Sequence, residues 1–302
     1  MKKLIFSILL LASTLLQASD IYVKPGESIA DAIRQARELR RLNDPSIEGG
    51  ITIHVAAGNY RIYEPLFLRP EDSGTPSSPT IIKGEGEVIV SGGVTVTGWK
   101  RQGKLMVADV PDFCGRPLDF RQFYVNGKKA VRARDVADFE DMYRIIRVDK
   151  QKRVLWVPAA AVRKIQKAPY AEMVLHEMWC VANLRIKDIM FAGDSAAVSF
   201  HDPESRIQFE HPWPCPMVTT DGHNSAFYLT NARELLDVPG EWYHDIRAGK
   251  LYYYPRQGEL IEEAVVPAVE TLLRVEGTLD RPVRNIRIEG LTFSYSTWMR
   301  PS

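Results

Sequence analysis

The sequence predicts a mainly β protein, folded as a stacked β-solenoid that an inserted β-rich domain interrupts. In residues 285–293 (NIRIEGLTF), apolar and polar residues alternate, a glycine intervenes and the alternation resumes, as in one turn of a solenoid. A second observation is a series of very short strands within residues 51–90, separated by glycine-rich corners instead of hairpin turns. Together, these patterns predict strands that stack on one another along the chain.

A helix is predicted directly before these strands. Ser28 is a suitable N-cap with Asp31 three positions later, and Asn43-Asp44-Pro45 ends the helix. Its apolar residues recur at helical spacing and form one face. Because the end of a solenoid exposes unpaired backbone and apolar surface, we expect this helix to cover it. The apolar face consists of Ile29, Ala32, Ile33, Ala36 and Leu39.

The middle of the chain has a different composition, richer in aromatic and charged residues and in hairpin signals. Asn126-Gly127 between two alternating runs predicts a type I′ hairpin, and Ala248-Gly249-Lys250 marks a second hairpin. We therefore expect the cap helix and first coils in residues 20–97, an inserted antiparallel β-rich domain in 98–268, and a return to the solenoid in 269–302, where it is truncated.

Residues 1–19 have the pattern of a secretory signal peptide. Lys2 and Lys3 precede an apolar run to Leu16, and small residues for cleavage follow. The alternative is a membrane anchor, but the run is shorter than the ~20 apolar residues that a spanning helix needs. We expect a secreted or periplasmic protein that begins near Ser19 or Asp20, and no later segment is apolar enough to span a membrane.

The overall composition excludes several kinds of partner. A formal net charge of +1 argues against nucleic acid, which usually selects a strongly basic face. No cysteine and histidine spacing matches a zinc site, and the predicted coils gather no acidic residues for calcium, so we expect no metal and no cofactor. For the three cysteines, we expect unpaired, buried side chains; a disulfide between Cys114 and Cys215 is the alternative.

Several segments resemble a known group of proteins. Residues 25–29 leading into the helix, residues 58–60 after a strand, and residues 285–293 resemble secreted right-handed parallel β-helix proteins that act on polysaccharides. Residues 123–128, 240–243 and 249–254 resemble the inserted β-domain of β-helix glycoside hydrolases that include α-L-fucosidases and xylanases. The resemblance implies a right-handed parallel β-helix and two catalytic carboxylates on later coils. No position here matches them, so the catalytic residues stay unassigned.

The most site-like segment is 175–180, which places His176, Glu177 and Trp179 within four residues. On a strand, His176 would share one face with Met178, and Glu177 would share the other with Trp179. An indole beside a carboxylate suits sugar binding, because the ring can stack on a pyranose. The alternative is a half-buried strand with a core tryptophan and a surface glutamate.

Further candidates for binding substrate lie in loops. Asp221 and His223 follow a pair of threonines in a polar loop that can contribute to a cleft rim, although Asp-Gly is also an ordinary turn signal. Trp213 lies between two prolines, which either present its ring to a ligand or pin the loop by burying it. Trp298, just beyond the last predicted strand, is placed to line a groove.

These observations lead to a functional hypothesis. The chain is expected to be the N-terminal part of a secreted glycoside hydrolase that binds a polysaccharide or oligosaccharide, with no catalytic carboxylate in the fragment. One alternative is a polysaccharide lyase on the same scaffold. Another is a non-catalytic carbohydrate-binding or adhesion protein, because a fold does not determine a function.

Overall fold

The computed structural model describes residues 18–301, so the predicted signal peptide lies almost wholly outside the described residues. The chain divides into two compact units. The first comprises the residues up to Gly92 together with Thr271–Ser294, and the second comprises Gly93–Glu270 and the residues from Tyr295 onward. The sequence placed these divisions at residues 97/98 and 268/269. No helix in the described range is long and apolar enough to cross a membrane.

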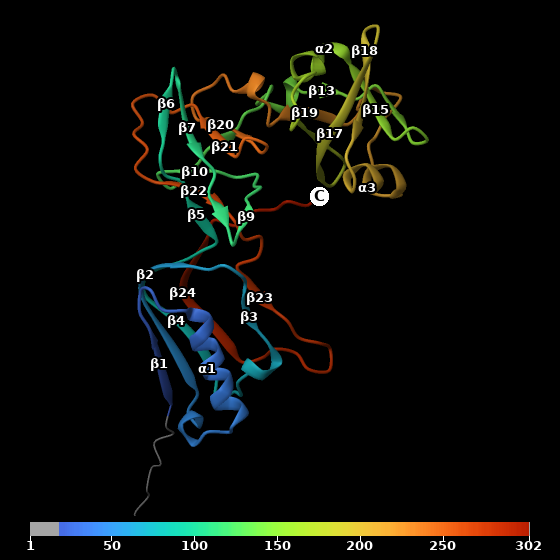
Figure 1. The fold of residues 1–302 in the computed structure, drawn as a ribbon. Helices are drawn as coiled ribbons and strands as arrows, with labels where there is room; N and C mark the ends of the chain where they lie inside the picture. The colour runs from blue at the N-terminus through green and yellow to red at the C-terminus, as the bar shows by residue number, and fades with distance from the viewer. Residues whose placement is uncertain (1–17, 302) are drawn as a thin grey trace, which may run out of the picture. The chain divides into compact units, whose positions relative to one another are not determined.

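The first unit is built on one sheet of parallel strands, in the order β1-β2-β4-β24 (Figure 1). A second, two-stranded parallel pair joins β3 to β23. Buried and less buried residues alternate in the first half of β2 and in β3, as a sheet with one covered face requires, whereas β24 has no buried residue. The elements are β1 (Ser19–Val23), α1 (Ile29–Arg41), β2 (Ile51–Arg61), β3 (Leu66–Leu68), β4 (Thr80–Ser91), β23 (Leu273–Val275) and β24 (Ile286–Ser294).

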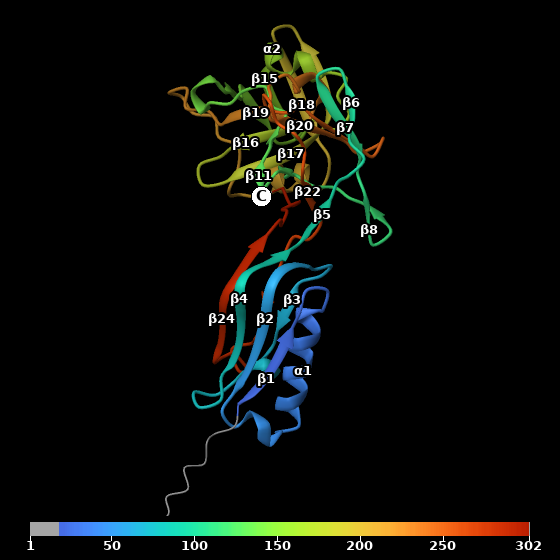
Figure 2. The same cartoon turned by 90° about the vertical axis from the view of Figure 1, so that its left-hand side faces the viewer.

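Helix α1 lies beside β1 and β2 and contacts β3 (Figure 2). It begins as predicted, since the Ser28 Oγ accepts a hydrogen bond from the Asp31 backbone N–H at 3.2 Å. Its buried residues are Ile29, Ala32, Ile33 and Ala36, which confirms the expected apolar face except for Leu39. Arg37 fixes the helix by a bidentate contact with the buried carboxylate of Asp72, at 2.8 Å for each oxygen.

Two glycines meet where β4 and β24 pair, and neither position has room for a side chain. A Cβ on Gly84 would collide with the carbonyl oxygen of Gly290, and Gly290 itself has a φ of 65°. The register of the pair shifts at this point, between Glu289 and Leu291. Gly290, which interrupts the alternation in residues 285–293, therefore adopts the positive φ of a β-bulge in a parallel sheet.

The second unit is a set of mostly antiparallel sheets around two hydrophobic cores. Seven strands form the largest sheet, in the order β13-β19-β16-β17-β18-β15-β14. Its strands and helices are β13 (Tyr143–Arg144), β14 (Arg147–Asp149), β15 (Val154–Pro158), α2 (Ala159–Val162), β16 (Glu172–His176), β17 (Val181–Ala192), β18 (Ser195–Phe200), α3 (Glu204–Glu210) and β19 (Ala226–Thr230).

Smaller sheets complete the second unit. Both hairpins predicted from the sequence are confirmed, with β10 pairing β11 around Asn126-Gly127 and β20 pairing β21. Asn126 and Gly127 both have positive φ, as a type I′ turn requires. The strands are β5 (Gly93–Thr95), β6 (Lys100–Gln102), β7 (Leu105–Asp109), β8 (Asp112–Phe113), β9 (Arg116–Pro117), β10 (Tyr124–Val125), β11 (Lys128–Lys129), β12 (Val131–Arg132), β20 (Glu241–Asp245), β21 (Lys250–Tyr253) and β22 (Ala264–Pro267).

The predicted right-handed parallel β-helix is wrong as the fold class. The protein is mainly β, but its described strands form multiple sheets and no closed solenoid, and in the second unit only β12 and β20 pair in parallel. The physical reason is that alternation with a period of two reports only that a strand has two different faces. Residues 285–293 do form a strand, β24, yet the pattern does not specify how the sheet is completed.

Candidate functional site

Three adjacent strands of the largest sheet provide the floor of a polar cavity in the second unit. The register pairs Val174 of β16 with both Tyr228 of β19 and Asn183 of β17, so these three side chains share one face. The residues between them point the other way and are fully buried in a hydrophobic core, as alternation along a strand requires. Those core residues are Met173, Leu175, Leu184, Phe227 and Leu229.

The segment 129–134 supplies the cationic wall of the cavity. Arg132 and Arg134 flank Ala133, which is buried in the same hydrophobic core, so the two arginines lie on the opposite side of the chain. The backbone of Arg134 forms an isolated antiparallel β-bridge with that of Thr230 at the end of β19, and this pairing anchors the segment beside the floor. Lys129, on β11 of the Asn126-Gly127 hairpin, lines the cavity as well.

A buried carboxylate holds two of the arginines in place. Glu172, only 4% exposed, accepts hydrogen bonds from Arg132 at 2.9 and 3.1 Å and from the Arg121 Nε at 3.1 Å. Burial favours the neutral acid, but the charges of Arg132 and Arg121 outweigh it and lower the pKa of Glu172. Glu172 is therefore ionised at neutral pH, and both its oxygens are occupied by guanidinium groups.

The residues after β24 close one side of the cavity. The Arg121 guanidinium donates to the backbone carbonyls of Arg300 at 2.9 Å and Trp298 at 3.4 Å. The backbone N–H of Asn183 donates to the Pro301 carbonyl at 2.7 Å. These contacts place the half-exposed indole of Trp298 beside Arg121 at the edge of the cavity.

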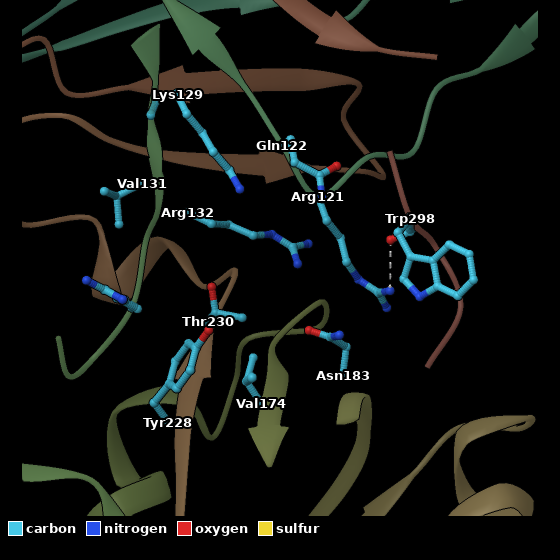
Figure 3. Close-up of a pocket in the computed structure, with 12 residues that line it drawn as sticks. Arg121, Gln122, Lys129, Val131, Arg132, Val174, Asn183, Tyr228, Thr230 and Trp298 are labelled. Carbon is cyan, nitrogen blue, oxygen red and sulfur yellow. Dashed lines mark hydrogen bonds between the residues drawn. The ribbon is translucent and has the colours of Figure 1, made fainter. Parts of the chain in front are cut away.

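The result is a cavity of about 420 Å³, within the range typical of small-ligand sites. Figure 3 shows Lys129 and Arg132 extending into a common space, with Tyr228, Thr230 and Asn183 on one side and Trp298 beside Arg121. Its charge is unbalanced, because four cationic side chains line it and one carboxylate, Glu172, pairs with two of them. The four cationic residues are Arg121, Lys129, Arg132 and Arg134.

A second feature of this unit is an exposed pair of aromatic rings, which we call the tryptophan pair. Trp179 and Trp213 are 80% and 43% exposed, with ring centroids 5.4 Å apart and planes at 77°. Trp179 lies in the loop between β16 and β17, and Trp213 follows α3. Two tryptophans named separately from the sequence thus lie side by side, and of the two alternatives for Trp213 the structure shows the exposed ring.

The expected strand through residues 175–180 is wrong beyond His176. β16 ends there, and residues 177–180 form a tight loop closed by the hydrogen bond from the Glu177 N–H to the Cys180 carbonyl at 2.9 Å. Glu177 therefore does not share a strand face with Trp179. Its carboxylate accepts a hydrogen bond from the Cys180 thiol, and burial raises its pKa. Burial, reinforced by Glu177, raises the pKa of Cys180 to about 12, so this thiol is unreactive at neutral pH.

The other predicted site residues have simpler environments. His176 packs against Phe139, and burial together with the charge of Arg144 lowers its pKa. Asp221 and His223 are exposed in a turn, where Asp221 accepts the His223 N–H at 3.3 Å, and neither lines the cationic cavity. The three cysteines are unpaired, but none is buried as expected: Cys114 is exposed, and Cys180 and Cys215 are intermediate.

Comparison with known proteins assigns the chain to a family. A model described as the GH141 insertion domain matches residues 103–256, which fall entirely within the second unit. The chain belongs to the GH141 family. No curated protein matches it.

A solved structure titled "Glycoside hydrolase" resembles this GH141 chain closely. It is 60% identical in sequence, with a TM-score of 0.86, and the match covers 94% of this chain and 51% of the other. The chain thus spans about half the length of that protein. The predicted relation to glycoside hydrolases is confirmed at this level, while the right-handed parallel β-helix that accompanied it is not supported.

Two carboxylates of the GH141 chain lie at one further cavity, of about 240 Å³, but they do not suit glycosidic cleavage. Asp119 and Glu172 both line it. Cleavage requires one carboxyl group as an acid and the other free to act as nucleophile or base. Both oxygens of Glu172 are already engaged by Arg121 and Arg132, so Glu172 is not available for that role. Among residues 18–301, no three His, Cys, Asp or Glu side chains are grouped to hold a metal ion.

Sequence reasoning missed most of the cationic cavity of the GH141 chain. Only Trp298 was named in advance. One local signal was present, since Arg132, Ala133 and Arg134 alternate in the manner of a strand and place both charges on one side. Arg121, Glu172 and Asn183 carry no such signal, because strand pairing and the return of the chain at residues 298–301 bring them together.

Proposed function

We propose that this chain is part of a secreted glycoside hydrolase that degrades a polysaccharide, and that its second unit binds the glycan. The observation that carries the proposal is the 60% identity over 94% of the chain to a solved glycoside hydrolase. The match of residues 103–256 to the GH141 insertion domain supports it independently.

The tryptophan pair is the surface best suited to a neutral glycan. Sugar rings present C–H groups on their faces, which pack against exposed aromatic rings, while their hydroxyl groups remain hydrated. Large aromatic side chains exposed together on a folded surface mark interaction sites. The perpendicular rings of Trp179 and Trp213 offer two such faces within 5.4 Å.

The catalytic carboxylates of the proposed enzyme lie outside these 302 residues. Hydrolysis requires two carboxyl groups about 5–5.5 Å apart for retention or about 6.5–9.5 Å apart for inversion. Glu172 is engaged by arginines, and the chain covers 51% of the related glycoside hydrolase. Both observations favour a reaction centre contributed by the rest of a longer protein.

Secretion is supported by the pattern of residues 1–19 and by the start of β1. The first strand begins at Ser19, whose N–H donates to the Gly50 carbonyl at 3.0 Å. Cleavage just before Ser19 would leave every described strand intact. Amino-terminal sequencing of the exported protein should therefore begin at Ser19, since the alternative start at Asp20 would shorten β1 by one residue.

Glycan binding can be tested with the exported chain and a panel of neutral polysaccharides in affinity electrophoresis. We expect at least one to bind, and Trp179→Ala and Trp213→Ala each to weaken binding by about 10-fold, as loss of an aromatic contact does. Leu260→Ala, which removes another exposed apolar side chain of the same unit, is the matched control and should bind normally. Equal binding by all four proteins would contradict the role of the tryptophan pair.

Catalysis is tested separately. The longer protein that contains this chain should release reducing sugars with saturated ends, and the chain alone should release none. Release of unsaturated sugars would identify a lyase instead, and robust hydrolysis by the chain alone would show that the reaction centre has been misplaced.

A further inference from the structure

The cationic cavity has more positive charge than its structural contacts use. Arg121 pairs with Glu172 and holds the carbonyls of Trp298 and Arg300, so its role in the fold is clear. Arg134 and Lys129 line the same cavity, and among the described residues their side chains make no hydrogen bond or ion pair. The positive charges of Lys129 and Arg134 therefore have no role in holding the fold together.

Arg132 is a third cation at this cavity. Its side chain is 10% exposed, and its guanidinium is held by Glu172 and lies over the ring of Trp242, with 5.6 Å between the Cζ atom and the ring centroid. Its Nε is buried and has no hydrogen-bond partner. Because this Nε is closed off from solvent, what Arg132 offers a ligand is the positive charge of its guanidinium at the cavity lining.

The remaining lining groups suit a sugar. Asn183, Tyr228 and Thr230 supply donors and acceptors of the kind that bind hydroxyl groups, and the Trp298 indole is half-exposed beside them. Burial raises the pKa of Tyr228, so its hydroxyl stays protonated and can donate. Guanidinium groups, for their part, match the planar geometry of a carboxylate.

We propose that this cavity binds a uronic acid unit of the glycan, with the sugar carboxylate facing Arg134, Lys129 and Arg132 and the sugar ring beside Trp298. The inference extends the proposed function, because it assigns the acidic sugar to the cavity and leaves neutral sugars to the tryptophan pair. The carboxylate of Asp119 also interacts with Arg121 and Arg132, so the positive charge left for a ligand comes mainly from Lys129 and Arg134.

The test compares tetramers of galacturonate and glucuronate with the corresponding neutral galactose and glucose tetramers by calorimetry on the exported chain. Each pair differs only at the sixth carbon. At least one acidic tetramer should bind at least about 10-fold more tightly than its neutral counterpart, and added salt should weaken that binding. A sulfated galactose tetramer distinguishes a sulfate ester from a carboxylate as the anionic group.

Two variants locate the binding. Arg134→Gln should weaken binding of the acidic tetramer by about 10- to 100-fold, as removal of a charged hydrogen bond does. Lys129→Gln should weaken the same binding by a smaller factor. The neighbouring Lys128→Gln is the matched control, because Lys128 lies on the same hairpin, is exposed and does not line the cavity. Melting temperatures of all three variants verify folding, and Lys129→Gln on the hairpin remains informative if Arg134→Gln does not fold.

The outcomes separate this inference from the proposed function. Equal affinity for acidic and neutral tetramers, equal loss in the Lys128 and Arg134 variants, or binding of the sulfated tetramer alone would each overturn the uronate assignment. In those cases, binding of neutral glycans would still depend on Trp179 and Trp213 if the proposed function holds. Conversely, uronate binding that depends on Arg134, without any effect of the tryptophan variants, would support the cavity and contradict the tryptophan pair.

Discussion

The cationic cavity and the tryptophan pair belong to the same unit but are built in opposite ways. The cavity depends on residues far apart in sequence, from Arg121 to Arg300, held by a buried ion cluster around Glu172. The tryptophan pair consists of two exposed side chains on loops, and only their ring contact is involved. Removing one member of the buried cluster should therefore destabilise the fold, whereas removing an exposed ring should leave the fold intact.

Removing the carboxylate that holds two arginines of the cavity should destabilise the protein most. Glu172→Gln would remove the carboxylate that is bonded to the buried Arg121 and Arg132, and breaking such a buried cluster costs about 3–5 kcal/mol. Chemical unfolding of the second unit measures this loss. Glu210→Gln is the matched control, because Glu210 pairs with Arg153 at the surface and its removal should cost about 0–1 kcal/mol. Similar losses of unfolding free energy in Glu172→Gln and Glu210→Gln would show that the buried cluster matters no more to stability than a surface ion pair.

A smaller effect is expected from pH. The pKa of Glu172 is lowered in the folded protein, so its ionised form contributes stability above the ordinary carboxyl pKa of 4.5. That contribution is lost as the pH falls below 4.5 and passes through the folded pKa. Unfolding curves between pH 7 and pH 3 should show a decline in stability that is reduced in Glu172→Gln. An unchanged decline in the variant would assign the acid sensitivity to other carboxylates.

The two regions also differ in how much of them the sequence predicts. Local signals succeed: Ser28 caps α1, and Asn126-Gly127 forms the type I′ hairpin, because the conformations involved are set within a few residues. Trp179 was named as a candidate on a predicted strand beside Glu177, and Trp213 because two prolines flank it. Their contact was not predicted, since it depends on how the β16–β17 loop and the segment after α3 meet.

Non-local structure explains what the sequence did not predict. The alternation in β24 is real, but neither its neighbour β4 nor the absence of a closed solenoid from the described strands follows from that pattern. The strand expected through Trp179 fails because the backbone turns at Glu177 to pair β16 with β17. Glu172 is similar: in the sequence it is an ordinary glutamate between Ala171 and Met173, and only strand pairing buries it among arginines.

The smallest expected effect concerns the stability of the tryptophan pair. Trp179 is 80% exposed, so Trp179→Ala removes little buried surface, and its free energy of unfolding should stay within about 0.5 kcal/mol of the original. Trp213, which is 43% exposed, should lose somewhat more when changed to alanine. Denaturant titrations of both variants, run beside Glu172→Gln, measure this directly. If Trp179→Ala lost as much unfolding free energy as Glu172→Gln, the tryptophan pair would itself stabilise the β16–β17 loop. The proposed difference between the two sites would then be wrong.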